Sequence, residues 1–266
     1  MACVGLLLAV GALAAGCGGD EPSPDDAAAV QTMLRSNAEV QRAMAPLYLC
    51  LPEEPACYEQ AAPAVVDAVE RQRGTVEDAV AETDDDCLQE AMGLYRDALV
   101  AYGEAGEAAS TADVAAVDAA LAETTDLEIA YTEKIDGCGF VEGQMAESSA
   151  ALRSASVGLL RLDPEFSACV DEACVVEVAG RGKELAHEAA VAVDEMLVEA
   201  RRDERVPSCY PRALEELRRA YRAAERGMQA LADLDLATAE RELRELTELG
   251  PQAQEDLAAC IGSAGP

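Results

Sequence analysis

The stretch "CLQEAMGLYRDALVAY", Cys87 to Tyr102, carries the pattern on which the expected fold rests. Alternating steps of four and three residues separate its large apolar side chains, which are Leu88, Met92, Tyr95, Leu99 and Tyr102. An average spacing of 3.5 residues is typical of helices that pack nearly parallel in a bundle. The stretch therefore predicts a helix with one face buried against neighbouring helices.

The same pattern returns later in the chain, in a segment framed by cysteines in the same way. Cys87 and Cys138 are 51 positions apart, and so are Cys209 and Cys260. Laid over each other without a gap, the two segments share non-alanine residues, among them Arg96 with Arg218, Asp113 with Asp235, Leu121 with Leu243 and Leu127 with Leu249. Self-similarity at a fixed offset predicts an internal duplication.

The composition favours helix throughout. Of 266 residues, 50% are apolar, yet there is no Trp and there are only two Phe, while Ala and Leu dominate. Alanine and leucine are strong helix formers. We expect an all-α fold of two tandem, duplicated up-down four-helix bundles, residues 27–138 and 139–266. The eight expected helices are 27–48, 57–82, 87–109, 113–137, 141–167, 174–203, 209–232 and 235–259.

Several residues predict where these helices begin or break. Asp86, Asp113 and Asp235 stand at positions where a carboxylate can cap free backbone N–H groups. Pro63 and the pair Gly250-Pro251 predict a break or kink, because proline lacks an N–H and clashes with the preceding turn.

The first residues, "MACVGLLLAVGALAAGC", form an apolar run that ends in small residues and is too short to span a bilayer comfortably. The segment "ALAAGC" resembles a bacterial lipoprotein signal. The resemblance implies that residues 1–16 are a signal peptide and that Cys17 carries the lipid. Residues 17–26 then form a flexible tether, rich in Gly, Pro and Asp. The alternatives are an ordinary cleaved signal or a buried helix.

A lipid-anchored envelope protein lies outside the cytoplasm, where cysteines form disulfides. With Cys3 in the signal and Cys17 lipidated, eight of the ten cysteines remain. A helix of about 25 residues is nearly 40 Å long, so only cysteines at the same end of a bundle can be joined. The predicted pairs are Cys50–Cys57, Cys87–Cys138, Cys169–Cys174 and Cys209–Cys260. A thiolate metal site would need a ligand spacing that these cysteines do not show.

The charge restricts the partners that the protein can have. Asp and Glu total 52 against 20 Lys and Arg, which gives a net charge of −32. Such a field repels phosphate backbones and attracts cations or basic partners. Nucleic-acid binding is therefore not expected. Most carboxylates are expected to coat solvated helix faces.

Candidate ligand residues are few. Glu184 and His187, the single histidine, are three residues apart and resemble half of the di-iron site of ferritin-like proteins, but no second histidine exists to complete it. Asp84, Asp85 and Asp86 could hold Ca²⁺ through oxygens or cap a helix, and capping is favoured because the spacing is not that of an EF-hand loop. No catalytic residue and no cofactor is predicted.

These observations predict a lipid-anchored, extracytoplasmic, non-enzymatic interaction or structural module of the cell envelope. It would attach to the membrane through its N-terminal lipid and bind an unidentified protein partner. The alternative is an extracytoplasmic binding protein for a divalent metal ion or a cationic small ligand.

Overall fold

The computed structural model describes residues 24–50, 54–138, 145–203 and 206–263, and this part of the chain is all-α, with no strand. The expected signal peptide and Cys17, with most of the tether, lie outside the described residues. The helices are α1 (Pro24–Tyr48), α2 (Pro55–Glu82), α3 (Asp86–Ser110), α4 (Val114–Gly137), α5 (Met145–Leu160), α6 (Asp163–Ala168), α7 (Glu172–Arg202), α8 (Tyr210–Ala232) and α9 (Leu236–Ser263).

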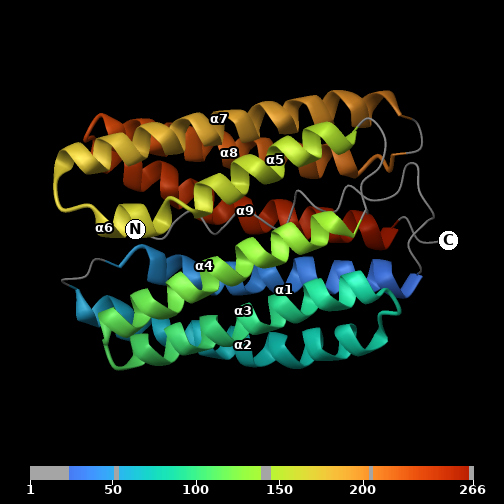
Figure 1. Ribbon diagram of the computed structural model, residues 1–266, viewed down its shortest axis with the longest axis horizontal. Helices are drawn as coiled ribbons and strands as arrows, with labels where there is room; N and C mark the ends of the chain where they lie inside the picture. Colours follow the sequence, from blue (N-terminus) through green and yellow to red (C-terminus); the bar gives the residue numbers. More distant parts are fainter. Residues whose placement is uncertain (1–23, 51–53, 139–144, 204–205, 264–266) are drawn as a thin grey trace.

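The long helices pack side by side along one direction (Figure 1). Each helix packs against the next in the order α4, α3, α2, α1, α9, α8, α7 and α5. Helix α5 also contacts α4. The helices before residue 139 are thus joined to those after it at two places, through α1 with α9 and through α4 with α5. Figure 1 shows α1 and α9 meeting in the middle of the molecule.

Most buried apolar side chains belong to one cluster that runs from Ala29 in α1 to Cys260 in α9, and Val157 and Leu160 of α5 form a small separate cluster with Ile129 of α4. The fully buried members of the main cluster include large residues such as Tyr95, Tyr102 and Tyr221, surrounded by many alanines. Small side chains let helix axes approach closely, and burial of apolar area supplies the driving force. The two predicted repeats therefore share a core, and their division at residue 138 stays a prediction.

One turn recurs 122 residues apart. Ala112 and Leu234 have positive φ angles of 53° and 58°, and each precedes an aspartate that caps the next helix. The carboxylate of Asp113 accepts from the N–H of Ala116, and that of Asp235 accepts from Thr238, both at 3.1 Å. This is the capping expected from the sequence. The shared geometry agrees with the predicted duplication, which it does not by itself establish.

Two expectations about helix ends were wrong. The expected helix 141–167 is split into α5 and α6, because Pro164 cannot donate to the preceding turn and instead lies in the first turn of α6, where no N–H is needed. The cap of α3 is Asp85, which accepts from the N–H of Leu88 at 2.7 Å, while Asp86 is already helical.

The prolines in the second and last helices break neither of them. Helix α2 continues through Pro63 and α9 through Pro251. Each proline removes one backbone hydrogen bond, and the buried residues on both sides, such as Ala62 and Val65 around Pro63, hold the flanking turns in place. Tertiary packing here outweighs local propensity.

Four disulfides close the bundle ends, and they are the four pairs that the helix lengths predict. Their Cα–Cα distances lie between 5.4 and 5.6 Å. Cys50–Cys57 and Cys169–Cys174 each join a helix end to the start of a later helix. Cys87–Cys138 and Cys209–Cys260 each enclose a complete helical hairpin. Each cross-link reduces the entropy of the unfolded chain.

The loop lengths predict the size of each disulfide's contribution. Replacing Cys87 and Cys138 together by alanine should lower the free energy of unfolding by about 4 kcal/mol, and replacing Cys50 and Cys57 by about 2.5 kcal/mol, because the longer loop loses more entropy when closed. Urea unfolding followed by circular dichroism measures both. A larger loss from the short loop than from the long one would contradict this account.

Candidate functional site

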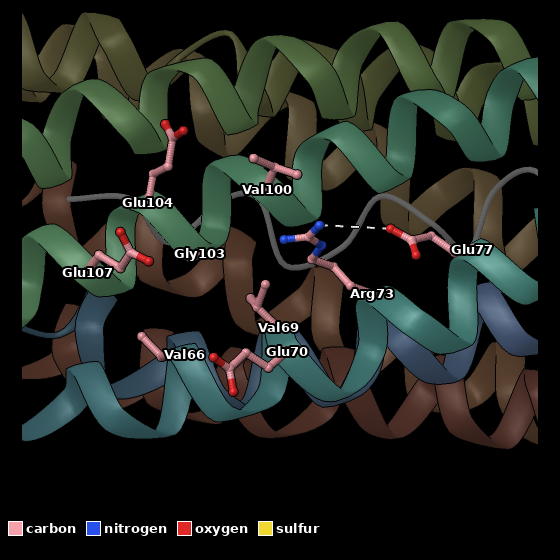
Figure 2. A pocket seen from close by; sticks show the side chains of 9 residues that line it. All are labelled: Val66, Val69, Glu70, Arg73, Glu77, Val100, Gly103, Glu104 and Glu107. Atoms are coloured by element: carbon pink, nitrogen blue, oxygen red, sulfur yellow. Dashed lines mark ion pairs between the residues drawn. The ribbon is translucent and has the colours of Figure 1, made fainter.

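A groove of about 500 Å³ runs between α2 and α3 (Figure 2). Val66 and Val69 of α2 and Val100 of α3 form its apolar part. Gly103 lies between them, and a Cβ there would stand 3.4 Å from Cγ1 of Val69, so the missing side chain keeps the groove open. Val100 is 40% exposed although it is apolar. The groove thus offers apolar surface to solvent.

Acidic side chains surround this apolar surface. Glu70, Glu104 and Glu107 line the groove, and Figure 2 shows Glu104 and Glu107 on the α3 side, toward one end. Toward the other end Arg73 pairs weakly with Glu77, with a nitrogen–oxygen distance of 3.9 Å. Within the described residues, Glu70, Glu104 and Glu107 form no ion pair. The groove therefore has a local excess of negative charge.

The charge balance differs sharply between two helix pairs. Helices α2 and α3 together carry eleven Asp and Glu against three Arg. Helices α7 and α8 carry ten Asp and Glu against nine Arg and Lys. Helices α2 and α3 thus carry much more uncompensated acidic charge than α7 and α8. Helix α4, with six Asp and Glu against one Lys, and α9, with six against two Arg, are acidic as well.

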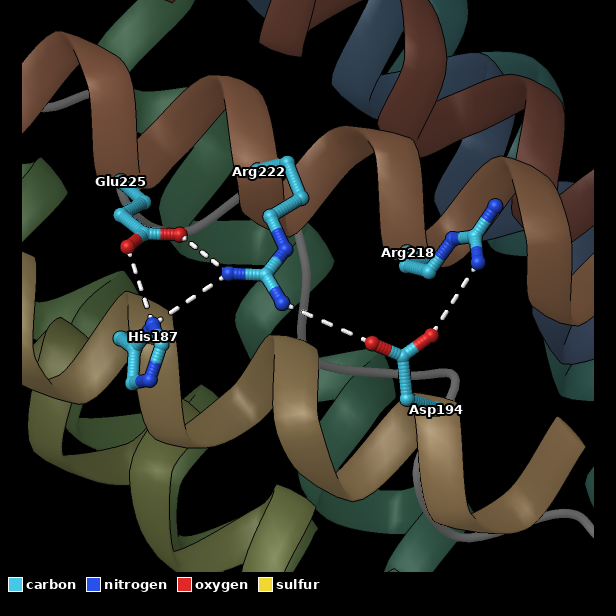
Figure 3. A network of polar contacts seen from close by, with 5 residues as sticks. All are labelled: His187, Asp194, Arg218, Arg222 and Glu225. Atoms are coloured by element: carbon cyan, nitrogen blue, oxygen red, sulfur yellow. Dashed lines mark hydrogen bonds and ion pairs between the residues drawn. The ribbon is translucent and has the colours of Figure 1, made fainter. Parts of the chain in front are cut away.

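Acidic side chains of the α7–α8 face are paired in a network centred on Arg222, with His187 at one end (Figure 3). Nδ1 of His187 lies 2.9 Å from Oε1 of Glu225 and 3.2 Å from Arg222. Asp194 forms ion pairs with Arg218 and Arg222, with nitrogen–oxygen distances of 3.1 and 3.5 Å. Partial burial raises the pKa of Glu225, but hydrogen bonds from Arg222 and His187 outweigh it and hold that pKa below its usual value.

The predicted metal candidates are not assembled into a metal centre. His187 points to α8, and Glu184 is exposed and takes no part in the network. Asp85 is occupied as the cap of α3, beside the exposed Asp84 and Asp86. Among the described residues, no group of three or more His, Cys, Asp or Glu side chains is arranged to hold a metal ion.

A second polar feature is a carboxyl group inside the first four helices. Glu128 of α4 is 5% exposed, and its Oε1 accepts hydrogen bonds from the hydroxyl of Tyr102 at 2.5 Å and from Nε2 of Gln41 at 3.2 Å. Burial raises the pKa of Glu128 to about 8, against the lowering effect of the Tyr102 hydrogen bond. The group is thus mostly protonated at neutral pH and does not place a charge in the core.

Asp163, the first residue of α6, is a second buried carboxyl group. It is 9% exposed, and its Oδ1 has no hydrogen-bond partner in the part of the chain that the structure describes. Burial raises the pKa of Asp163 to about 7, and its charge also raises that of Glu128. The charge of Asp163 in α6 therefore favours the neutral form of Glu128 in α4.

Sequence reasoning missed Glu128 and the groove. Glu128 occupies the position between Thr124 and Tyr131 on the apolar seam of α4. The periodicity alone therefore indicates that this glutamate is buried. The groove has no such signal, because it depends on how closely α2 and α3 approach. Its residues come from two helices whose relative rotation the sequence does not specify.

Comparisons of the chain with known protein families, with curated proteins and with solved structures find no match. Among the helices that the structure describes, none is long and apolar enough to cross a membrane.

The buried carboxyl group of Glu128 predicts a specific pH dependence. Because its pKa is raised in the folded state, its contribution to stability is complete below about pH 4.5 and is lost as the pH rises through about 8. Relative to a Glu128→Gln variant, wild type should lose up to about 5 kcal/mol of unfolding free energy between acid pH and pH 9.

Chemical unfolding at several pH values measures this difference. Glu123→Gln is the control, because Glu123 is an exposed residue of the same helix. Equal pH dependence in wild type and Glu128→Gln would show that the buried group does not bind its proton more tightly in the folded protein.

Proposed function

We propose that this protein is a lipid-anchored, extracytoplasmic and non-enzymatic interaction module of the bacterial cell envelope. The lipoprotein-like segment that ends at Cys17 supports the anchor. The four disulfides support an oxidising compartment, since such bonds do not persist among cytosolic thiols. The function itself is carried by one observation, the groove between α2 and α3, in which apolar side chains lie beside Glu70, Glu104 and Glu107.

The acidic charge on α2 and α3 has an energetic cost. Eleven carboxylates on two adjacent helices repel one another and reduce the stability of the folded state. On the α7–α8 face, arginines relieve the same repulsion within the protein. A basic partner that covers the α2–α3 side would relieve it there. Electrostatic complementarity of this kind increases the association rate and selects partners by charge.

A second candidate is the binding of a cationic small ligand. The groove volume of about 500 Å³ favours it, since small-molecule sites are commonly of this size. A divalent metal ion has no comparable support from a cluster of ligands among the described side chains.

The lipid anchor can be tested through Cys17. In a secreting bacterial host, the wild-type chain should incorporate labelled palmitate and sediment with membranes, whereas Cys17→Ala should do neither, because the thiol that accepts the lipid is absent. Palmitate incorporation that persists in Cys17→Ala would disprove this assignment.

The interaction surface can be tested by photo-crosslinking in living cells. A photoreactive amino acid at Val100, on the α2–α3 side, should give a discrete adduct that is lost when Glu70, Glu104 and Glu107 are changed to Gln. The control position is Val191 on α7, which is 38% exposed against 40% for Val100. No adduct at Val100, or the same adducts at both positions, would count against the proposed function.

A further inference from the structure

The groove between α2 and α3 combines two recognition features in one place. Val100, which is 40% exposed, and the partly exposed Val66 provide apolar contact above Val69, which is only 4% exposed. Glu70, Glu104 and Glu107 provide negative charge beside them. Carboxylates on a flat helix face would attract any cation, including small hydrated ions. An apolar strip next to them favours an occupant that is cationic on its edges and apolar in its centre.

The length of the groove points to a macromolecular occupant. On α2 its lining extends from Val66 to Glu77. At 1.5 Å per residue this is roughly 16 Å, which is about three turns of an α-helix. An amphipathic helix binds such a groove with apolar side chains spaced three and four residues apart. Its flanking Lys or Arg residues would then lie near the glutamates.

We propose that the α2–α3 groove binds a basic, amphipathic helical segment of a partner protein. This inference rests on the proposed function and names the chemistry of the partner. The bound helix would cover the exposed Val100 and place cations beside Glu70, Glu104 and Glu107, which have no ion-pair partners within the described chain. It would pack along α2 and α3 as a third helix packs on a pair, at the usual interhelical distances.

The proposal is tested with a defined probe, the acetylated and amidated peptide LKKLLKLLKKLLKL, whose leucines form one helix face. Binding to the oxidised protein is measured by calorimetry, and the contact by the NMR methyl signals of Val66, Val69 and Val100. We expect these signals to shift on binding. The affinity should fall as salt is added, because the charges involved are exposed.

Two comparison peptides separate charge from shape. One has Glu in place of every Lys, and the other has the same composition with its leucines spread around the helix. Both should bind at least about tenfold more weakly than the probe, because one reverses the charge and the other removes the apolar face. Equal binding of the rearranged peptide would overturn the proposal, since attraction would then be to charge alone.

Matched protein variants locate the site. Changing Glu70, Glu104 and Glu107 to Gln should weaken probe binding by about tenfold or more, and Val100→Ser by about threefold. The charge control changes three exposed carboxylates outside the groove, Glu59→Gln, Asp118→Asn and Glu123→Gln. The apolar control is Val191→Ser. Both controls should change the affinity by less than about twofold.

The remaining outcomes are also decisive. If the three control substitutions lower the affinity for the probe as much as the three groove substitutions do, the peptide binds to charge anywhere on the surface and the proposal is wrong. If spermidine shifts the same valine signals and displaces the probe at comparable concentration, the occupant is a small cation and the helical partner is wrong. If the probe peptide does not bind while the crosslink from Val100 persists, the proposed function stands and only the helical class of partner is refuted.

Discussion

The structure depends on one electrostatic constraint, which is that 52 carboxylates must each reach water, a cation or a proton. Burying an unpaired charge is too costly for a domain of ordinary stability. Most Asp and Glu residues therefore lie on outer helix faces, and alanine-rich stripes are left to form the interior. The few buried carboxylates follow the same rule. Glu242 is held by Arg226 at 2.6 Å and by Arg241 at 3.1 Å, while Glu128 retains a proton.

This constraint is met differently on the two sides of the molecule. Between α7 and α8, arginines neutralise acidic neighbours, and the network around His187 and Asp194 is satisfied within the protein. Between α2 and α3 the carboxylates face solvent around an open apolar groove. A surface that has already paired its charges offers little to a charged partner, whereas one that has not gains from contact. The groove that combines apolar and acidic side chains, rather than the total charge, distinguishes the α2–α3 side.

Much of the architecture could be predicted from the sequence because it follows from short-range periodicity and from simple lengths. The seam of Leu88, Met92 and Tyr95 lies in the core, and helix length alone excludes a bond from Cys57 to Cys87. The errors arise where packing competes with local preference: Pro63 stays inside a helix, while Pro164 begins one. Neither the groove nor the contact of α1 with α9 could be predicted, since both depend on the rotation of packed helices about their axes.

The order of the disulfides has a consequence for biosynthesis. The eight bonded cysteines pair in chain order, the first with the second, the third with the fourth and so on, and no bond crosses or encloses another. In a chain that emerges amino end first, the two cysteines of each pair are both present before the first cysteine of the next pair appears. Oxidation in step with synthesis would then give this set of bonds without the slow reshuffling that interleaved pairings require.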